Sequence, residues 1–113
     1  MTIRVLEAVR DELKTCHAIG SEREFCEQWL GKSECYIRTL RFNDLHPSAD
    51  ALMTCASKLG WYAGELQRSS DRHHQHWAVV FGKLREDCVT AVEQSARTKW
   101  RNATASRKNP CVD

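Results

Sequence analysis

The chain has 113 residues, of which 42% are hydrophobic and 28% charged, a composition typical of one globular domain that excludes a disordered chain. No apolar run approaches the ~20 residues that a membrane helix requires, and the first residues lack the pattern of a signal peptide, so we expect a cytoplasmic protein without membrane contact. The formal net charge of +2 is weaker than the basic bias of a dedicated nucleic-acid binder, although affinity depends on local rather than total charge.

The first predicted helix spans residues 3–18. Thr2 stands at the position of its cap, and Gly20 is placed to end it. Apolar residues recur along it at helical spacing, at Val5, Leu6, Val9, Leu13 and Cys16.

A second helix is predicted to begin at Ser21, because Ser21 and Glu24 have the order of a capping box. It continues through Leu30 and is stopped by Gly31. A third helix then starts at Ser33, as its cap, and closes at residues 43–44.

Ser48 caps a fourth predicted helix, with Pro47 just before it. Gly60 either ends that helix or lies inside a longer one. A final long helix follows the break at residues 69–71 and runs to about Trp100. The sequence therefore predicts an all-α fold of four to five helices with a long C-terminal helix, divided into residues 1–70, the helix 71–102 and a flexible tail 103–113.

The long helix carries a seam of apolar residues, spaced alternately four and three apart, at Trp77, Phe81, Leu84, Cys88, Ala91 and Ser95. Such a seam favours either a homodimer through this helix or packing against the chain's own domain, and the sequence leaves both open. The end of the chain is basic, at Arg97, Lys99, Arg101, Arg107 and Lys108.

Catalytic and metal sites find little support in the sequence. The six cysteines include no Cys-x-x-Cys pair, and we expect reduced thiols: Cys16, Cys26, Cys35, Cys55, Cys88 and Cys111. Four of them fall at apolar positions of helical patterns and are expected as small core residues: Cys16, Cys26, Cys55 and Cys88. His73, His74 and His76 lack an acid or cysteine at ligand spacing, and with Asp71 they favour a polar helix start. No Gly-rich phosphate loop or nucleophile elbow is present, so we expect no enzyme and no cofactor.

Residues 21–60 carry the most specific pattern in the chain. Leu30-Gly31 is followed by Ser33 and Ile37, then by Pro47-Ser48, and a leucine-rich helix ends in Leu59-Gly60. In this order and spacing the segment resembles the helix-turn-helix of Cro, the lambda repressor and related bacterial regulators (XRE-like proteins). The resemblance covers about a third of the chain.

The resemblance implies a DNA-binding transcriptional regulator whose recognition helix enters the major groove of double-stranded DNA. Glu34, Cys35 and Arg38 would then face base edges. Ser33 would cap the recognition helix near a phosphate, and the other backbone contacts would come from Arg23, Lys32 and Arg41.

Two departures from the family pattern support an alternative function. Glu27 stands where relatives carry a small residue, and Lys32 where they carry an apolar one. Cys26 would take the small position if the helix were slightly rotated, and the stem of Lys32 would pack while its amine stays in water. The alternative is a non-catalytic protein-interaction module that keeps the helix-turn-helix shape. Acids interleaved among the expected DNA-binding cations would favour it.

Overall fold

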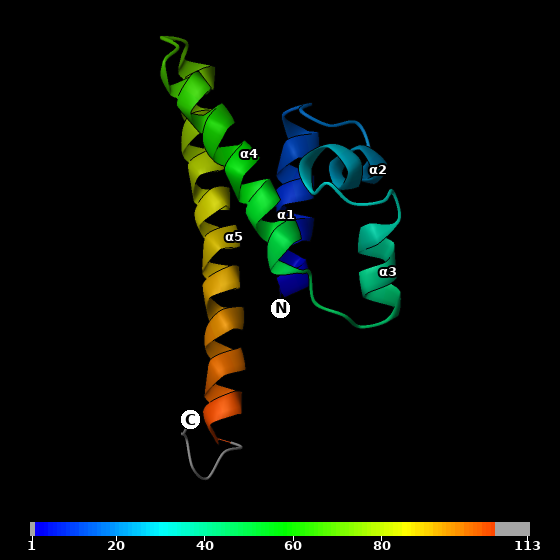
Figure 1. Ribbon diagram of the computed structural model, residues 1–113. Coiled ribbons are helices and arrows are strands. Elements are labelled where there is room, and N and C mark those ends of the chain that lie inside the picture. The colour runs from blue at the N-terminus through cyan, green and yellow to red at the C-terminus, as the bar shows by residue number, and fades with distance from the viewer. Residues whose placement is uncertain (1, 106–113) are drawn as a thin grey trace.

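The computed structural model describes residues 2–105, and in that range the protein contains helices and no strand. The predicted all-α class with a long C-terminal helix is confirmed (Figure 1). The elements in order are α1 (Thr2–Thr15), α2 (Glu22–Glu24), the π-helical turn η1 (Phe25–Trp29), α3 (Tyr36–Phe42), α4 (Ala49–Gln67) and α5 (Arg72–Ala105).

The first helix differs from its prediction at both ends. Thr2 lies within α1 instead of capping it. At the other end α1 stops at Thr15, not before Gly20, because His17 adopts a left-handed conformation with φ of 64°. The N–H of Ala18 then bonds back to the carbonyl of Leu13 at 2.8 Å, which closes the helix in the usual C-terminal manner.

The start of α4 agrees with the prediction. The hydroxyl of Ser48 accepts a hydrogen bond from the backbone N–H of Ala51 at 3.1 Å, as an N-cap does. The hydroxyl of Tyr36 accepts another from the backbone N–H of Ser48 at 3.0 Å. The beginnings of α3 and α4 are thereby tied together across the loop 43–48, in which Pro47 is buried.

Gly60 lies inside α4, so the longer of the two predicted helices is the one formed. α4 and α5 are joined by residues 68–71 and lie side by side as a helical hairpin (Figure 1). The seam of α5 is buried from Phe81 to Ala91, in the same cluster as Leu59 of α4. Packing within the chain, one of the two predicted uses of the seam, is therefore what the structure shows for these residues.

One hydrophobic core joins all the helices except the three-residue α2. α1, the turn η1, α3, α4 and α5 each contribute to it, so the predicted segments 1–70 and 71–102 share a core. Trp29 connects three elements, because its ring stacks on Tyr62 with centroids 5.6 Å apart and meets Phe81 edge-on at 6.4 Å. Through this core the turn η1 packs against α4, and α1 contacts both α3 and α5.

The C-terminal part of α5 extends past the start of α4 (Figure 1). Residues 93–105 of this helix, here called the overhang, are all exposed. Thirteen helical residues span about 20 Å. The overhang includes residues 103–105 of the predicted tail, whereas residues 106–113, with Arg107, Lys108 and Cys111, lie outside the described residues.

Within residues 2–105, no helix combines the length and the apolar character that crossing a bilayer would demand.

Candidate nucleic-acid interface

The helix that precedes the turn begins as the sequence predicts. The hydroxyl of Ser21 accepts a hydrogen bond from the backbone N–H of Glu24 at 3.1 Å. The carboxylate of Glu24 reaches back to the backbone N–H of Gly20 at 2.8 Å, one residue earlier than in an ideal capping box. Ser21 and Glu24 therefore fix where α2 starts.

The next turn is π-helical, which the sequence did not predict. The backbone N–H of Leu30 bonds to the carbonyl of Phe25, five residues earlier, at 3.2 Å. The wider turn changes which side chains face the core: Cys26 is fully buried, whereas the side chain of Glu27 keeps 40% of its exposure. Cys26 thus faces the core at this turn, and the carboxylate of Glu27 stays at the surface, where it lies near Arg23.

Gly31 makes the turn between the two helices. Its φ of 66° is the left-handed conformation that glycine adopts without strain. Lys32 then returns its backbone N–H to the carbonyl of Cys26 at 2.9 Å. The Lys32 side chain is 28% exposed, and its amine lies 3.1 Å from the carboxylate of Asp50, so its stem packs while its charge stays at the surface as expected.

The prediction that Ser33 caps the third helix is wrong. α3 begins three residues later, at Tyr36, and its first flanking residue is Cys35, whose side chain makes no capping hydrogen bond. The carbonyl of Ser33 closes a turn with the N–H of Tyr36 at 3.1 Å, and its hydroxyl lies 3.7 Å from the sulfur of Cys35. The seven-residue α3 therefore does not offer a phosphate the capped N-terminus that was expected.

The three expected base-reading residues do not share one helix face. Glu34 and Cys35 lie in the turn before α3, and only Arg38 lies on the helix, where it is exposed. Glu34 points to Arg23, with the two charged groups 3.8 Å apart. Hydrogen bonds with Ser33 and Thr39 lower the pKa of the Cys35 thiol, and the nearby Arg38 cation adds to that effect.

Acids interleave with the cations that were expected to contact DNA phosphates. Arg23 lies 3.5 Å from the carboxylate of Glu27 as well as near Glu34. Arg41 lies 2.7 Å from Glu7 and 3.9 Å from Glu22. With Lys32 paired to Asp50, every cation of the predicted backbone-contact set has a carboxylate within 4 Å.

The partner of Arg41 is the feature that sequence reasoning missed. Glu7 lies on α1, 34 residues earlier in the chain, and the periodicity of α1 reveals only its apolar face. Arg10 of α1 also pairs with Glu22 of α2, at 2.5 Å. These charges bridge α1, α2 and α3 at the surface, which is a structural use of groups that the sequence assigned to DNA.

The histidine cluster forms a helix start, as predicted. The carboxylate of Asp71 accepts a hydrogen bond from the backbone N–H of His73 at 2.7 Å, and this bond lowers the pKa of Asp71. The ring of His74 lies 2.7 Å from the hydroxyl of Ser69. Among residues 2–105, no group of three His, Cys, Asp or Glu is arranged to hold a metal ion.

A family model described as "Family of unknown function (DUF6626)" matches residues 6–101. The chain belongs to the DUF6626 family. The DUF6626 match begins in α1, includes α2, α3 and α4, and ends within the overhang of α5, so the turn region and most of the overhang belong to one family unit. No curated protein and no solved structure matches the chain.

Proposed function

We propose that this DUF6626 protein is a non-catalytic protein-interaction module built on a helix-turn-helix-like arrangement. The observation that carries the proposal is the pairing of Arg23, Lys32 and Arg41 with carboxylates. A protein that neutralises phosphates needs cations whose local field is positive. Here each cation would first have to leave an acid, and the acid would remain to repel the DNA.

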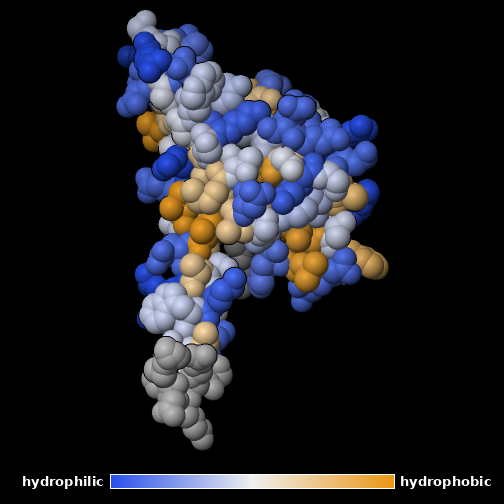
Figure 2. Space-filling view, in the orientation of Figure 1, coloured by the Kyte–Doolittle hydropathy of each residue, from blue (hydrophilic) through white to orange (hydrophobic). Residues whose placement is uncertain are grey.

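The surface offers the large apolar side chains that protein interfaces use. Trp61 is 61% exposed and Trp100 is 57% exposed, and tryptophan is among the residues enriched at interaction hot spots. Figure 2 shows orange, hydrophobic groups along the α4–α5 hairpin and beside α3, separated by hydrophilic residues. Single exposed apolar residues are common in soluble proteins. The proposal is therefore supported by the fact that two of these residues are tryptophan, and not by how many apolar residues are exposed.

Sequence-specific DNA binding stays the second candidate. The observation in its favour is that the two helices are joined through a left-handed Gly31 and that Arg38 is exposed on α3. In that function Arg38 would read a base, and a dimer would present two recognition helices about 34 Å apart.

Binding of labelled genomic DNA fragments, titrated across salt, separates the two functions. The interaction module predicts no fragment-selective binding at about 50 mM salt, where phosphate contacts are strongest. The double substitution Glu7→Gln and Glu22→Gln, which releases Arg41, serves as a control and is expected to raise nonselective DNA affinity. Fragment-selective binding by the native protein that Arg38→Ala relaxes would refute the proposal and establish the DNA reader.

A further inference from the structure

The buried face of α5 continues beyond the helix that covers it. From Phe81 to Ala91 this face is packed in the core. Past that point Val92, Ala96 and Lys99 follow at spacings of four and three, which keeps them on one face of the helix. Trp100 flanks this face and is 57% exposed. Val92 still packs against the core, and beyond it the overhang carries an extension of the α4–α5 contact face, at Ala96 and Lys99, that no other described helix covers.

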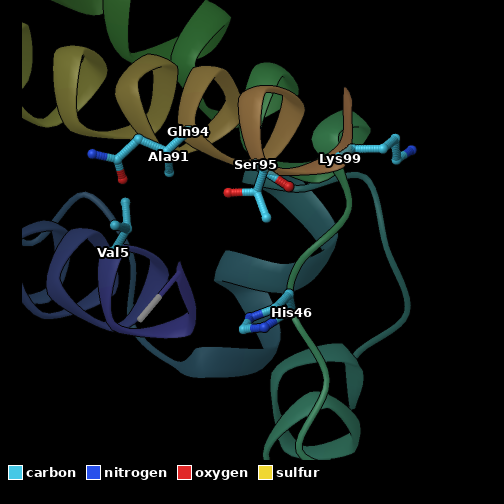
Figure 3. Close-up of a pocket in the computed structure, with 7 residues that line it drawn as sticks. Val5, His46, Ala91, Gln94, Ser95 and Lys99 are labelled. Atoms are coloured by element: carbon cyan, nitrogen blue, oxygen red, sulfur yellow. The ribbon is translucent and has the colours of Figure 1, made fainter. Parts of the chain in front are cut away.

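Two hollows lie along this extension. The larger, of about 570 Å³, lies between α5 and Val5 of α1, with His46 at its edge. The smaller, of about 190 Å³, lies between α5 and the start of α4, where Leu52 and Pro47 form one wall and Ala96 and Trp100 the other. Both are lined by Ser95 and Lys99, so they flank one turn of the overhang. Figure 3 shows Val5 and His46 across the larger hollow from Ser95.

The chain cannot fill this place with its own α4. α4 begins at Ala49, because Ser48 is its N-cap and Pro47 stands before the cap. The chain that leads into Pro47 comes from α3 and not from the direction of the α4 axis (Figure 1). Proline lacks the N–H that a helix extended backwards through this point would use, and its ring disfavours helical geometry at the residue before it. The chain's own α4 therefore does not extend along the overhang, and a helix from another molecule could lie in line with it there.

Lys99 indicates which charge a helix bound in this place should carry. Its position lines both hollows, so a helix laid along Val92, Ala96 and Trp100 would lie beside it and shield part of its side chain from water. Burying an unpaired charge is costly, and a facing carboxylate offsets the cost. The overhang has three cations, Arg97, Lys99 and Arg101, against one acid, Glu93, which also favours an acidic partner.

We propose that the groove between the overhang, the start of α4 and α1 binds an amphipathic helix of a protein partner that lies in line with α4 and presents a carboxylate to Lys99. This inference rests on the proposed interaction function and adds its surface and the class of its partner. Recognition would be of the helix-in-groove kind, with apolar anchors at i, i+3 or i+4 and i+7.

Two other occupants fit the groove less well. A second copy that docked through its own overhang would bring the same excess of cations against Lys99. Nucleic acid would use the cations but would leave Ala96 and the exposed part of Val92 without apolar contacts. A helix with an apolar stripe and an acid at its centre satisfies both features of the groove.

The test uses the full chain and a displayed library of helical peptides, about 18 residues long so that a helix can persist, with Leu, Ala, Glu and Lys varied over their surface. The enriched peptides are expected to carry an apolar stripe with Glu at its centre, and their affinities are then measured by fluorescence anisotropy. Trp100→Ala is expected to weaken binding at least fivefold. Trp61→Ala removes an equally exposed tryptophan at the other end of α4 and should leave binding unchanged.

A charge exchange gives the sharper result. Lys99→Glu is expected to weaken the Glu-bearing peptides at least tenfold, and replacement of that Glu by Lys in the peptide should restore most of the affinity. Circular dichroism checks that these exposed substitutions leave the helices intact. Binding that depends on Trp61 and not on Trp100 or Lys99 would overturn the groove while the interaction function stands.

Three further outcomes would also overturn the proposed helix partner. If no peptide is enriched, the groove does not bind helices. If sedimentation equilibrium shows a dimer that Trp100→Ala dissociates, the occupant is a second copy. If Lys99→Glu abolishes binding of a DNA fragment while Trp100→Ala and the peptides have no effect, the overhang contacts nucleic acid, and the proposed function fails with it.

Discussion

Gly31 adopts a left-handed backbone conformation, and its replacement by alanine should change the free energy of unfolding by an amount that can be worked out from the structure. A Cβ at this position would have space, since its nearest neighbour is the methyl group of Thr54 at 4.0 Å. The cost is therefore backbone strain at a φ of 66°, about 1–2 kcal/mol for a residue with a Cβ. The smaller entropy of the unfolded chain returns about 0.4–1 kcal/mol. We expect Gly31→Ala to lower the free energy of unfolding by about 1 kcal/mol.

The same substitution at two other glycines is expected to have the opposite sign. Gly64 and Gly82 lie inside α4 and α5, and a Cβ at either would meet no atom within 4 Å. Gly64→Ala and Gly82→Ala should each stabilise the protein by about 0.5–1 kcal/mol. Urea unfolding followed by circular dichroism measures all three on one scale. The strain argument fails if the free energy of unfolding of Gly31→Ala is equal to that of Gly82→Ala or greater.

Two further predictions concern ionisable groups. The thiol of Cys35 has a lowered pKa and should therefore react with iodoacetamide in the folded protein before the buried thiols of Cys26, Cys55 and Cys88. Mass spectrometry of the labelled peptides measures the four rates, and equal rates under native conditions would contradict the structure. Asp71 has a folded pKa below the unfolded value of about 3.9, so its contribution to stability is present above that pH and is lost as the pH falls through the folded pKa. Asp71→Asn should therefore lessen the fall in melting temperature as the pH is lowered from neutral into the acid range. An unchanged pH profile would show that Asp71 does not contribute to it.

Local signals in the sequence were sufficient to predict the class of fold and most helix starts. Ser21, Ser48 and Asp71 each cap a helix where a short polar residue precedes an apolar pattern. These signals act within about four residues, so one sequence contains them completely. The burial of Cys55 and Cys88 follows for the same reason, since each lies on the apolar stripe of its helix.

The candidate site was predicted less well, because its properties depend on contacts between distant segments. Ser33 has the right residue type for a cap, but the turn at residues 33–35 delays α3 to Tyr36. Arg41 looks free in the sequence, and only the packing of α1 against α3 brings Glu7 to it. Whether the seam of α5 pairs with a partner or with α4 is likewise settled by tertiary packing and not by spacing.

The π-turn at Phe25–Trp29 has a consequence for aligning this chain with sequences that have an ordinary α-helix at this place. A turn closed by a bond from residue i to i+5 holds one residue more than a turn of α-helix. A homologue with an ordinary α-helix here would therefore align correctly only with a one-residue gap between Ser21 and Gly31. In an ungapped alignment, the exposed Glu27 would fall in the column of a residue that faces the core, although Cys26 is the residue that faces the core here. Column-by-column comparison would thus report a charged substitution where the molecule has none.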